Sequence, residues 1–135
     1  MERSYEKSKS IKTNKELQQR MEKEYEVLQE AYEYLKKLDG GARLAIECFN
    51  EGNQGKGYNL LAQIAEGLAW LVDAFTLTQG AQKEKINRDE LNEVISELIE
   101  AMENRDENLI VELLEFELIS RIELWQETLK RTILN

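Results

Sequence analysis

The stretch GYNLLAQIAEGLAWLVDAFTL, residues 57–77, decides the fold class because it is long, apolar and almost free of charge. Only Glu66 and Asp73 are ionised in it, and its apolar residues recur every three or four positions, as in an α-helix with one buried face. The stripe consists of Leu60, Ile64, Leu68, Leu71 and Phe75, widened by Leu61, Ala65 and Val72. A stripe this broad predicts a core helix that contacts more than one neighbour.

A longer helix is predicted upstream, from about residue 15 to residue 38. Its expected inner face follows spacings of three, four and seven and consists of Leu17, Met21, Leu28, Ala31, Leu35 and Leu38. The glycines of DGG, residues 39–41, release the backbone and permit a kink or a short break. The helical pattern then resumes as far as Phe49, and the glycine-rich loop NEGNQGKG follows at residues 50–57.

Two helices downstream complete the predicted fold. In NRDE, residues 87–90, Asn87 is expected to cap a helix and Glu90 to complete a capping box. The last helix is predicted from about residue 107 towards the C-terminus, with an inner face of Val111, Leu114, Leu118, Ile122, Trp125, Leu129 and Ile133.

Short links between long amphipathic helices favour antiparallel neighbours. The sequence therefore predicts an all-α fold, an up-and-down antiparallel bundle of four principal helices. The core is expected to include Leu28, Leu35, Ile64, Leu68, Leu71, Ile95, Leu98, Leu118 and Trp125.

Length and charge limit the organisation of the chain and its partners. A chain of 135 residues without proline or histidine is long enough for one helical domain, expected at residues 15–135. Residues 1–14, polar and mixed in charge, are predicted to be a flexible segment that is dispensable for folding. Residues 1–15 hold five basic and two acidic side chains, a charge of +3, so the rest of the chain carries −12 and the whole chain −9. A body of this charge should repel nucleic acid and anionic membranes. We expect the basic segment to be weakly attracted to an acidic face around Glu93, Glu97 and Glu100.

The single cysteine and the lack of a signal-like or membrane-spanning segment predict a cytoplasmic location. Cys48 is the only cysteine and lies in apolar helical surroundings, which indicates a small buried side chain and a reducing compartment. The N-terminus has no apolar core of a secretory signal, and no run of about 20 uncharged apolar residues is present.

The absence of histidine limits the chemistry. It excludes Ser-His-Asp and Cys-His arrangements, histidine-bearing zinc sites and the Glu-x-x-His motif of di-iron bundles. A carboxylate site for Mg²⁺, as in all-α nucleotide pyrophosphohydrolases, is a remote alternative, with Glu90/Glu93 or Glu97/Glu100 as the first pair and Glu103/Asp106 as the second. These pairs are close together and face away from the Leu91–Met102 stripe, whereas Mg²⁺ needs converging carboxylates. We therefore expect no catalytic, metal-binding or cofactor-binding residues.

Two apolar stripes lie away from the main inner faces. Trp70 is about 140° from the centre of its stripe, and the last helix has a second stripe roughly opposite its first. The residues concerned are Trp70, Leu77, Leu109, Leu113 and Phe116. They either form a second core layer beneath the first helix or segment 42–50, or bind an amphipathic segment of a partner protein or a second copy of the chain.

Three segments resemble the helical bundle of flagellar export chaperones, especially those that hold flagellin. They are LDGGARLAIECFNEGN (38–53), LNEVISELIEAMENRDENLIVELLE (91–115) and WQETL (125–129), within a resemblance that covers about residues 35–130. Gly41-Ala42 and Trp125-Gln126-Glu127 stand where that family has a Gly-Ala/Cys step and a Trp-Lys-Glu-like ending. The long helical N-terminal region departs from the short strap of such chaperones. The chain is equally similar to small, uncharacterised acidic helical proteins of Firmicutes-type bacteria.

The predicted function is that of a non-enzymatic helical protein-interaction module. The resemblance implies a chaperone-like role in which the bundle masks an apolar or amphipathic segment of a partner. The alternative is a self-associating structural protein, a homodimer whose interface contains the two additional stripes.

Overall fold

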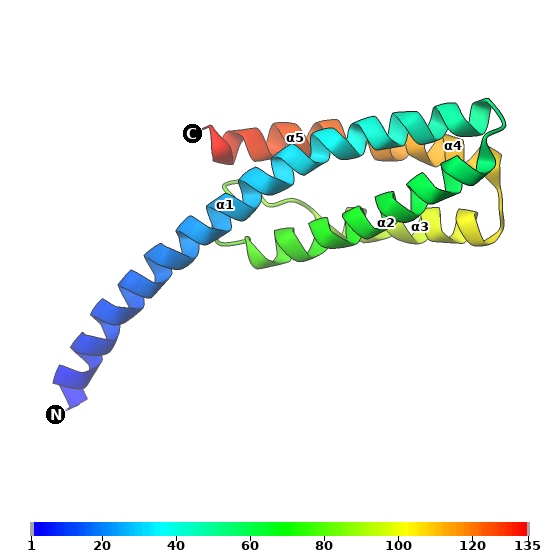
Figure 1. Ribbon diagram of the computed structural model, residues 1–135. Helices are drawn as coiled ribbons and strands as arrows, with labels where there is room; N and C mark the ends of the chain where they lie inside the picture. The colour runs from blue at the N-terminus through cyan, green and yellow to red at the C-terminus, as the bar shows by residue number, and fades with distance from the viewer. Residues whose placement is uncertain (1, 135) are drawn as a thin grey trace.

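The computed structural model describes the backbone of residues 2–134 and the side chains of residues 14–134. The described residues form four helical rods and contain no strand (Figure 1). The first three rods are α1 (Glu2–Asn50), α2 (Gln54–Leu77) and α3 (Arg88–Glu103). The fourth is a continuous rod made of α4 (Glu107–Glu112), the π-helix η1 (Leu113–Leu118) and α5 (Ile119–Ile133). The predicted all-α bundle of four principal helices is confirmed.

The rods are arranged in a closed ring. α1 contacts α2 on one side and the α4–η1–α5 rod on the other, while α3 connects α2 with α4 and η1. The α2 helix and the fourth rod therefore lie diagonally across the bundle. Of the nine residues predicted for the core, Ile95 is partly buried and the other eight are buried. Cys48 is buried as well, as predicted.

The DGG segment, where the sequence permits a kink or a short break, does not interrupt α1. Leu38, Ala42 and Ala45 are buried on either side of the glycines, so the bundle holds the helix on both sides. This packing offsets the helix-propensity cost of a glycine, about 1 kcal/mol. An ion pair of 3.0 Å between Arg43 Nε and Asp39 Oδ2 also spans the two glycines.

The fourth rod contains a π-helical turn that the sequence pattern does not reveal. The backbone N–H of Ile119 donates to the carbonyl of Leu114, five residues earlier. In a π-helix residues five apart stack on one face. The pairs Leu113/Leu118 and Leu114/Ile119 are consequently all buried, although an α-helix would turn one member of each pair outwards.

The link between α2 and α3 is closed by a buried glutamine. The amide of Gln82 donates to the Phe75 carbonyl (3.0 Å) and to Thr78 Oγ1 (3.1 Å), and its oxygen accepts from the Ile86 N–H (3.0 Å). Asn87 caps α3 through the Asp89 N–H, as predicted. The Glu90 carboxylate does not complete a capping box and instead lies 4.0 Å from Arg121 Nε.

The N-terminal half of α1 extends past the bundle (Figure 1). Near the point where α1 leaves the bundle, the hydroxyl of Tyr25 donates to the carbonyl of Ile133 at the end of α5. Leu17 and Met21 are 46% and 50% exposed, so their assignment to the inner face was wrong. The periodicity is real, but the neighbouring helices end before they reach these two residues.

The first residues of α1 are helical in their backbone and lead away from the bundle (Figure 1). The flexibility of residues 1–14 and their dispensability for folding stay predictions. The expected attraction of this segment to Glu93, Glu97 and Glu100 concerns side chains outside the described ones.

The α2 helix is long and apolar enough to cross a membrane by length and composition alone. In the bundle its apolar face is occupied, because Leu61, Leu68 and Phe75 are buried in the core. A core helix of this kind accounts for the composition of α2 without a membrane.

Removing a core leucine should create a cavity. Leu68 and Leu98 are buried, so Leu68→Ala and Leu98→Ala should each lower the free energy of unfolding by about 2–5 kcal/mol. Leu124→Ala is the matched control, because Leu124 is exposed and its loss should change stability by less than about 0.5 kcal/mol. Urea unfolding followed by circular dichroism measures all three, and a neutral Leu68→Ala would show that the inner face of α2 is wrongly assigned.

Candidate partner-binding surface

A glycine in the middle of α2 lets an aromatic side chain from α1 approach the α2 backbone. A Cβ atom added at Gly67 would overlap the Tyr34 hydroxyl and lie 2.6 Å from Tyr34 Cζ. Only glycine leaves room for the phenol ring at this position. Gly67 therefore sets the place of Tyr34 between the two helices.

Tyr34 in turn supports Trp70. The two rings meet edge to face, with centroids 5.5 Å apart and an interplanar angle of 61°. Partial burial, reinforced by the Glu66 carboxylate, raises the pKa of the Tyr34 phenol. Trp70 remains 39% exposed. Tyr34 therefore fixes the position of the Trp70 ring, and the pair forms a partly exposed aromatic surface rather than a second core layer.

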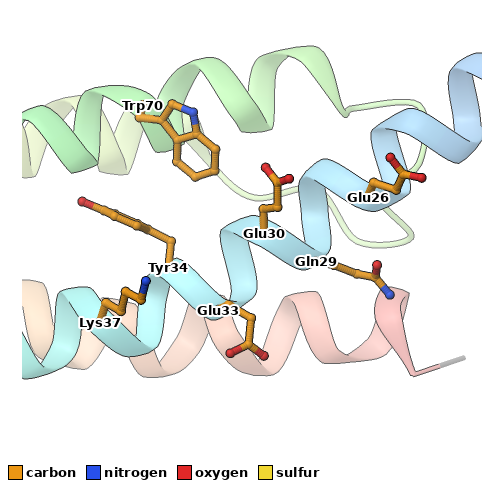
Figure 2. Close-up of a pocket in the computed structure, with 7 residues that line it drawn as sticks. All are labelled: Glu26, Gln29, Glu30, Glu33, Tyr34, Lys37 and Trp70. Carbon is orange, nitrogen blue, oxygen red and sulfur yellow. The ribbon is translucent and has the colours of Figure 1, made fainter.

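Acidic side chains surround this aromatic pair. An open concavity of about 720 Å³ is lined by Tyr34 and Trp70 together with Glu26, Gln29, Glu30, Glu33 and Lys37. Figure 2 shows Trp70 of α2 and Tyr34 and Glu30 of α1 pointing into the space between the two helices, with Glu33 on the other side of α1. Three carboxylates and one lysine make the concavity acidic.

A second open concavity continues the first towards the projecting end of α1. It has a volume of about 620 Å³ and is lined only by α1 residues: Gln18, Met21, Glu22, Tyr25, Glu26 and Gln29. Glu26 and Gln29 line both concavities. Together they form one surface from Gln18 to Lys37, including Trp70, which we call the α1 track.

The five residues predicted to bind a partner do not form one surface. Trp70 lies on the α1 track, and Leu77 is 72% exposed at the end of α2. Leu113 is only 7% exposed and belongs to the core, because the π-helical turn draws it inwards. Leu109 and Leu113 line a separate pocket of about 240 Å³ beside α3, and Phe116 on η1 is 67% exposed. The two stripes therefore lie on rods at opposite corners of the bundle.

The sequence interpretation missed Tyr34 and the carboxylates that accompany it. Glu26, Glu30 and Glu33 look like an ordinary solvated helix face when the position of α2 is unknown. Gly67 was the available signal, because a glycine inside a strongly helical segment costs stability and indicates a close approach.

The carboxylate pairs of the Mg²⁺ alternative lie on α3 and in the link that follows it. Glu93, Glu97 and Glu100 are exposed on α3. Among the side chains of residues 14–134, no group of three or more His, Cys, Asp or Glu could hold a metal ion. Asp106 instead caps α4, because its Oδ1 accepts from the Leu109 N–H at 3.2 Å.

The fold and surface define an all-α bundle with an extended first helix. The chain belongs to the family described as Domain of unknown function (DUF8042), whose model matches residues 26–128. The matched region begins one residue after Tyr25 and ends at Thr128, so it leaves out the projecting part of α1 and the last residues of α5. The comparisons found no match among curated proteins and none among solved structures.

The close approach at Gly67 predicts that the effect of Gly67→Ala on the free energy of unfolding changes sign when Tyr34 is removed. Gly67→Ala should lower the free energy of unfolding by about 1–3 kcal/mol, because its Cβ would displace the phenol ring. In a Tyr34→Ala background the same substitution should instead stabilise the helix by about 0.5–1 kcal/mol.

Gly40→Ala is the matched control, because nothing lies within 4 Å of a Cβ at Gly40 in the same bundle. It should stabilise the protein in both backgrounds. Equal effects of Gly67→Ala with and without Tyr34, measured by urea unfolding, would contradict the contact.

Proposed function

We propose that the protein is a non-enzymatic helical interaction module that binds a basic amphipathic helix along the α1 track. The observation that carries the proposal is the projecting half of α1, on which Leu17 and Met21 continue the apolar face of the bundle into solvent. An extended helix without tertiary contacts is only marginally stable. A partner that covers its apolar side chains would supply the missing stabilisation.

The charges of the track favour a basic partner. Glu22, Glu26, Glu30 and Glu33 lie along it, and Lys37 is the one basic residue among those that line it. Exposed ion pairs contribute about 0–1 kcal/mol each, so they orient a partner more than they hold it.

The affinity would come from apolar contacts at the two ends of the track. Met21 and Tyr25 lie at the projecting end, and Tyr34 and Trp70 lie at the other. Burying one such side chain stabilises a complex by about 1.5–3 kcal/mol. Tryptophan and tyrosine are also enriched among the residues that carry most of the binding energy at protein interfaces.

The proposal keeps the partner class implied by the resemblance to flagellar export chaperones, an apolar or amphipathic helical segment. It differs in the place of binding. The track lies on α1 and on the α1-facing side of α2, whereas the second predicted stripe lies beside α3.

A designed peptide tests this function without a known partner. The probe is a synthetic helix with leucine on one face and lysine on the other, and its control has glutamate in place of lysine. In a Trp125→Phe variant, Trp70 is the only tryptophan and reports on the track. The lysine peptide should shift the Trp70 emission to the blue, and the glutamate peptide should not.

Substitutions on the track should weaken binding of the lysine peptide. Met21→Ser and Glu30→Lys should each weaken it several-fold, and Trp70→Ala should weaken it by about 30-fold, or about 2 kcal/mol, in a titration that does not rely on Trp70 emission. Glu97→Lys on α3 is the matched control and should leave binding unchanged. No binding of the lysine peptide, or equal binding of both peptides, would contradict the proposal.

A further inference from the structure

We propose that the occupant of the α1 track is the N-terminal part of α1 from a second copy of this chain, packed antiparallel to the first. This inference rests on the proposed function, because it names the basic helix that the track binds. It makes the protein a homodimer in which each copy supplies one track and one basic segment.

The charge pattern along α1 determines the direction of pairing. Residues 1–15 carry five basic and two acidic side chains, whereas residues 16–33 carry two basic and six acidic ones. An antiparallel pair places the basic part of each helix beside the acidic part of the other. A parallel pair would place like charges side by side along the whole overlap.

The basic segment cannot reach the track of its own chain. α1 is one helix from Glu2 to Asn50, and its first residues lead away from the bundle (Figure 1). A helix does not fold back on itself without a break. A segment of this composition therefore meets the track only when it comes from another molecule.

The lengths of the two elements agree. The track from Gln18 to Lys37 spans about 30 Å, and residues 2–20 of α1 form a helical segment about 28 Å long. If Leu17 of one copy faces Met21 of the other, position 12 lies opposite position 26 and position 8 lies opposite position 30. The pairing sets Lys12 beside Glu26.

The arrangement is closed and self-complementary. A two-fold axis between Leu17 and Met21 makes both contacts identical, so each basic segment occupies one track and no further copy can add. The exposed apolar residues of the projecting half then meet at the centre of the interface, and the ion pairs lie at its two ends.

Sedimentation equilibrium of the full chain gives the first measurement. We expect a reversible monomer–dimer equilibrium in 50 mM salt that weakens at least tenfold in 500 mM salt, because the end contacts are exposed and screened. A protein that stays monomeric at several hundred micromolar in 50 mM salt would overturn the inference.

Charge reversal gives a sharper test through two variants. One carries Glu26→Lys, Glu30→Lys and Glu33→Lys, and the other carries Lys7→Glu, Lys9→Glu and Lys12→Glu. Each variant alone should dimerise at least tenfold more weakly, because both of its contacts repel. An equimolar mixture should restore dimers, because each altered segment then lies beside a track of opposite charge.

The matched control reverses three acidic residues outside the track. Glu93→Lys, Glu97→Lys and Glu100→Lys change the net charge by the same amount on α3 and should leave dimerisation unchanged. Circular dichroism verifies that each variant keeps its helix content. A mixture that fails to form dimers from folded variants would overturn the inference.

The direction of pairing is tested by cross-linking in a Cys48→Ala background. Lys12→Cys and Glu26→Cys variants should form a disulfide with each other when mixed. Preferential linking of Lys12→Cys to itself would show a parallel pair and overturn the antiparallel arrangement. A monomer that still binds the lysine peptide would overturn the dimer and leave the proposed function standing.

Discussion

A helix of 49 residues runs beside a helix of 24 residues, so the shorter one covers only about half of the longer. The bundle buries α1 from Leu28 to Phe49 against α2 and the fourth rod. Beyond Tyr25 no other described helix accompanies it, although Leu17 and Met21 continue the same spacing. The mismatch in length divides α1 into a structural half and an exposed half.

The structural half of α1 also contributes to the α1 track, which continues onto the exposed half. Gly67 admits Tyr34, Tyr34 supports Trp70, and the acidic residues of α1 surround this pair. At one end of the track the packing of α1 against α2 holds its side chains in place. At the other end the track consists of α1 residues alone. Apolar contacts would supply most of the binding energy there, and the carboxylates would set partner charge and direction.

The sequence predicted the bundle well because helical periodicity reports burial directly. It predicted the wrong fate for Leu17 because periodicity does not report where a neighbouring helix ends, and Leu17 and Leu28 follow the same pattern. Leu113 belongs to the core, which is one of the two possibilities that the sequence left open for it. The sequence pattern did not show the π-helical turn that contains it and that packs against α1 and α3. The Tyr34 and Glu30 surface was not predicted, because it exists only where α2 lies beside α1, and Gly67 was the one sequence signal of that approach.

Hydrogen exchange along α1 tests the division of this helix most directly. At low micromolar concentration, amides from Leu28 to Phe49 should exchange slowly and those from Asn14 to Glu22 should exchange rapidly, because an unaccompanied helix opens easily. At several hundred micromolar in low salt, the second group should become protected while the first group changes little. Equal protection of both groups at low concentration, or no gain for residues 14–22 at high concentration, would contradict the account.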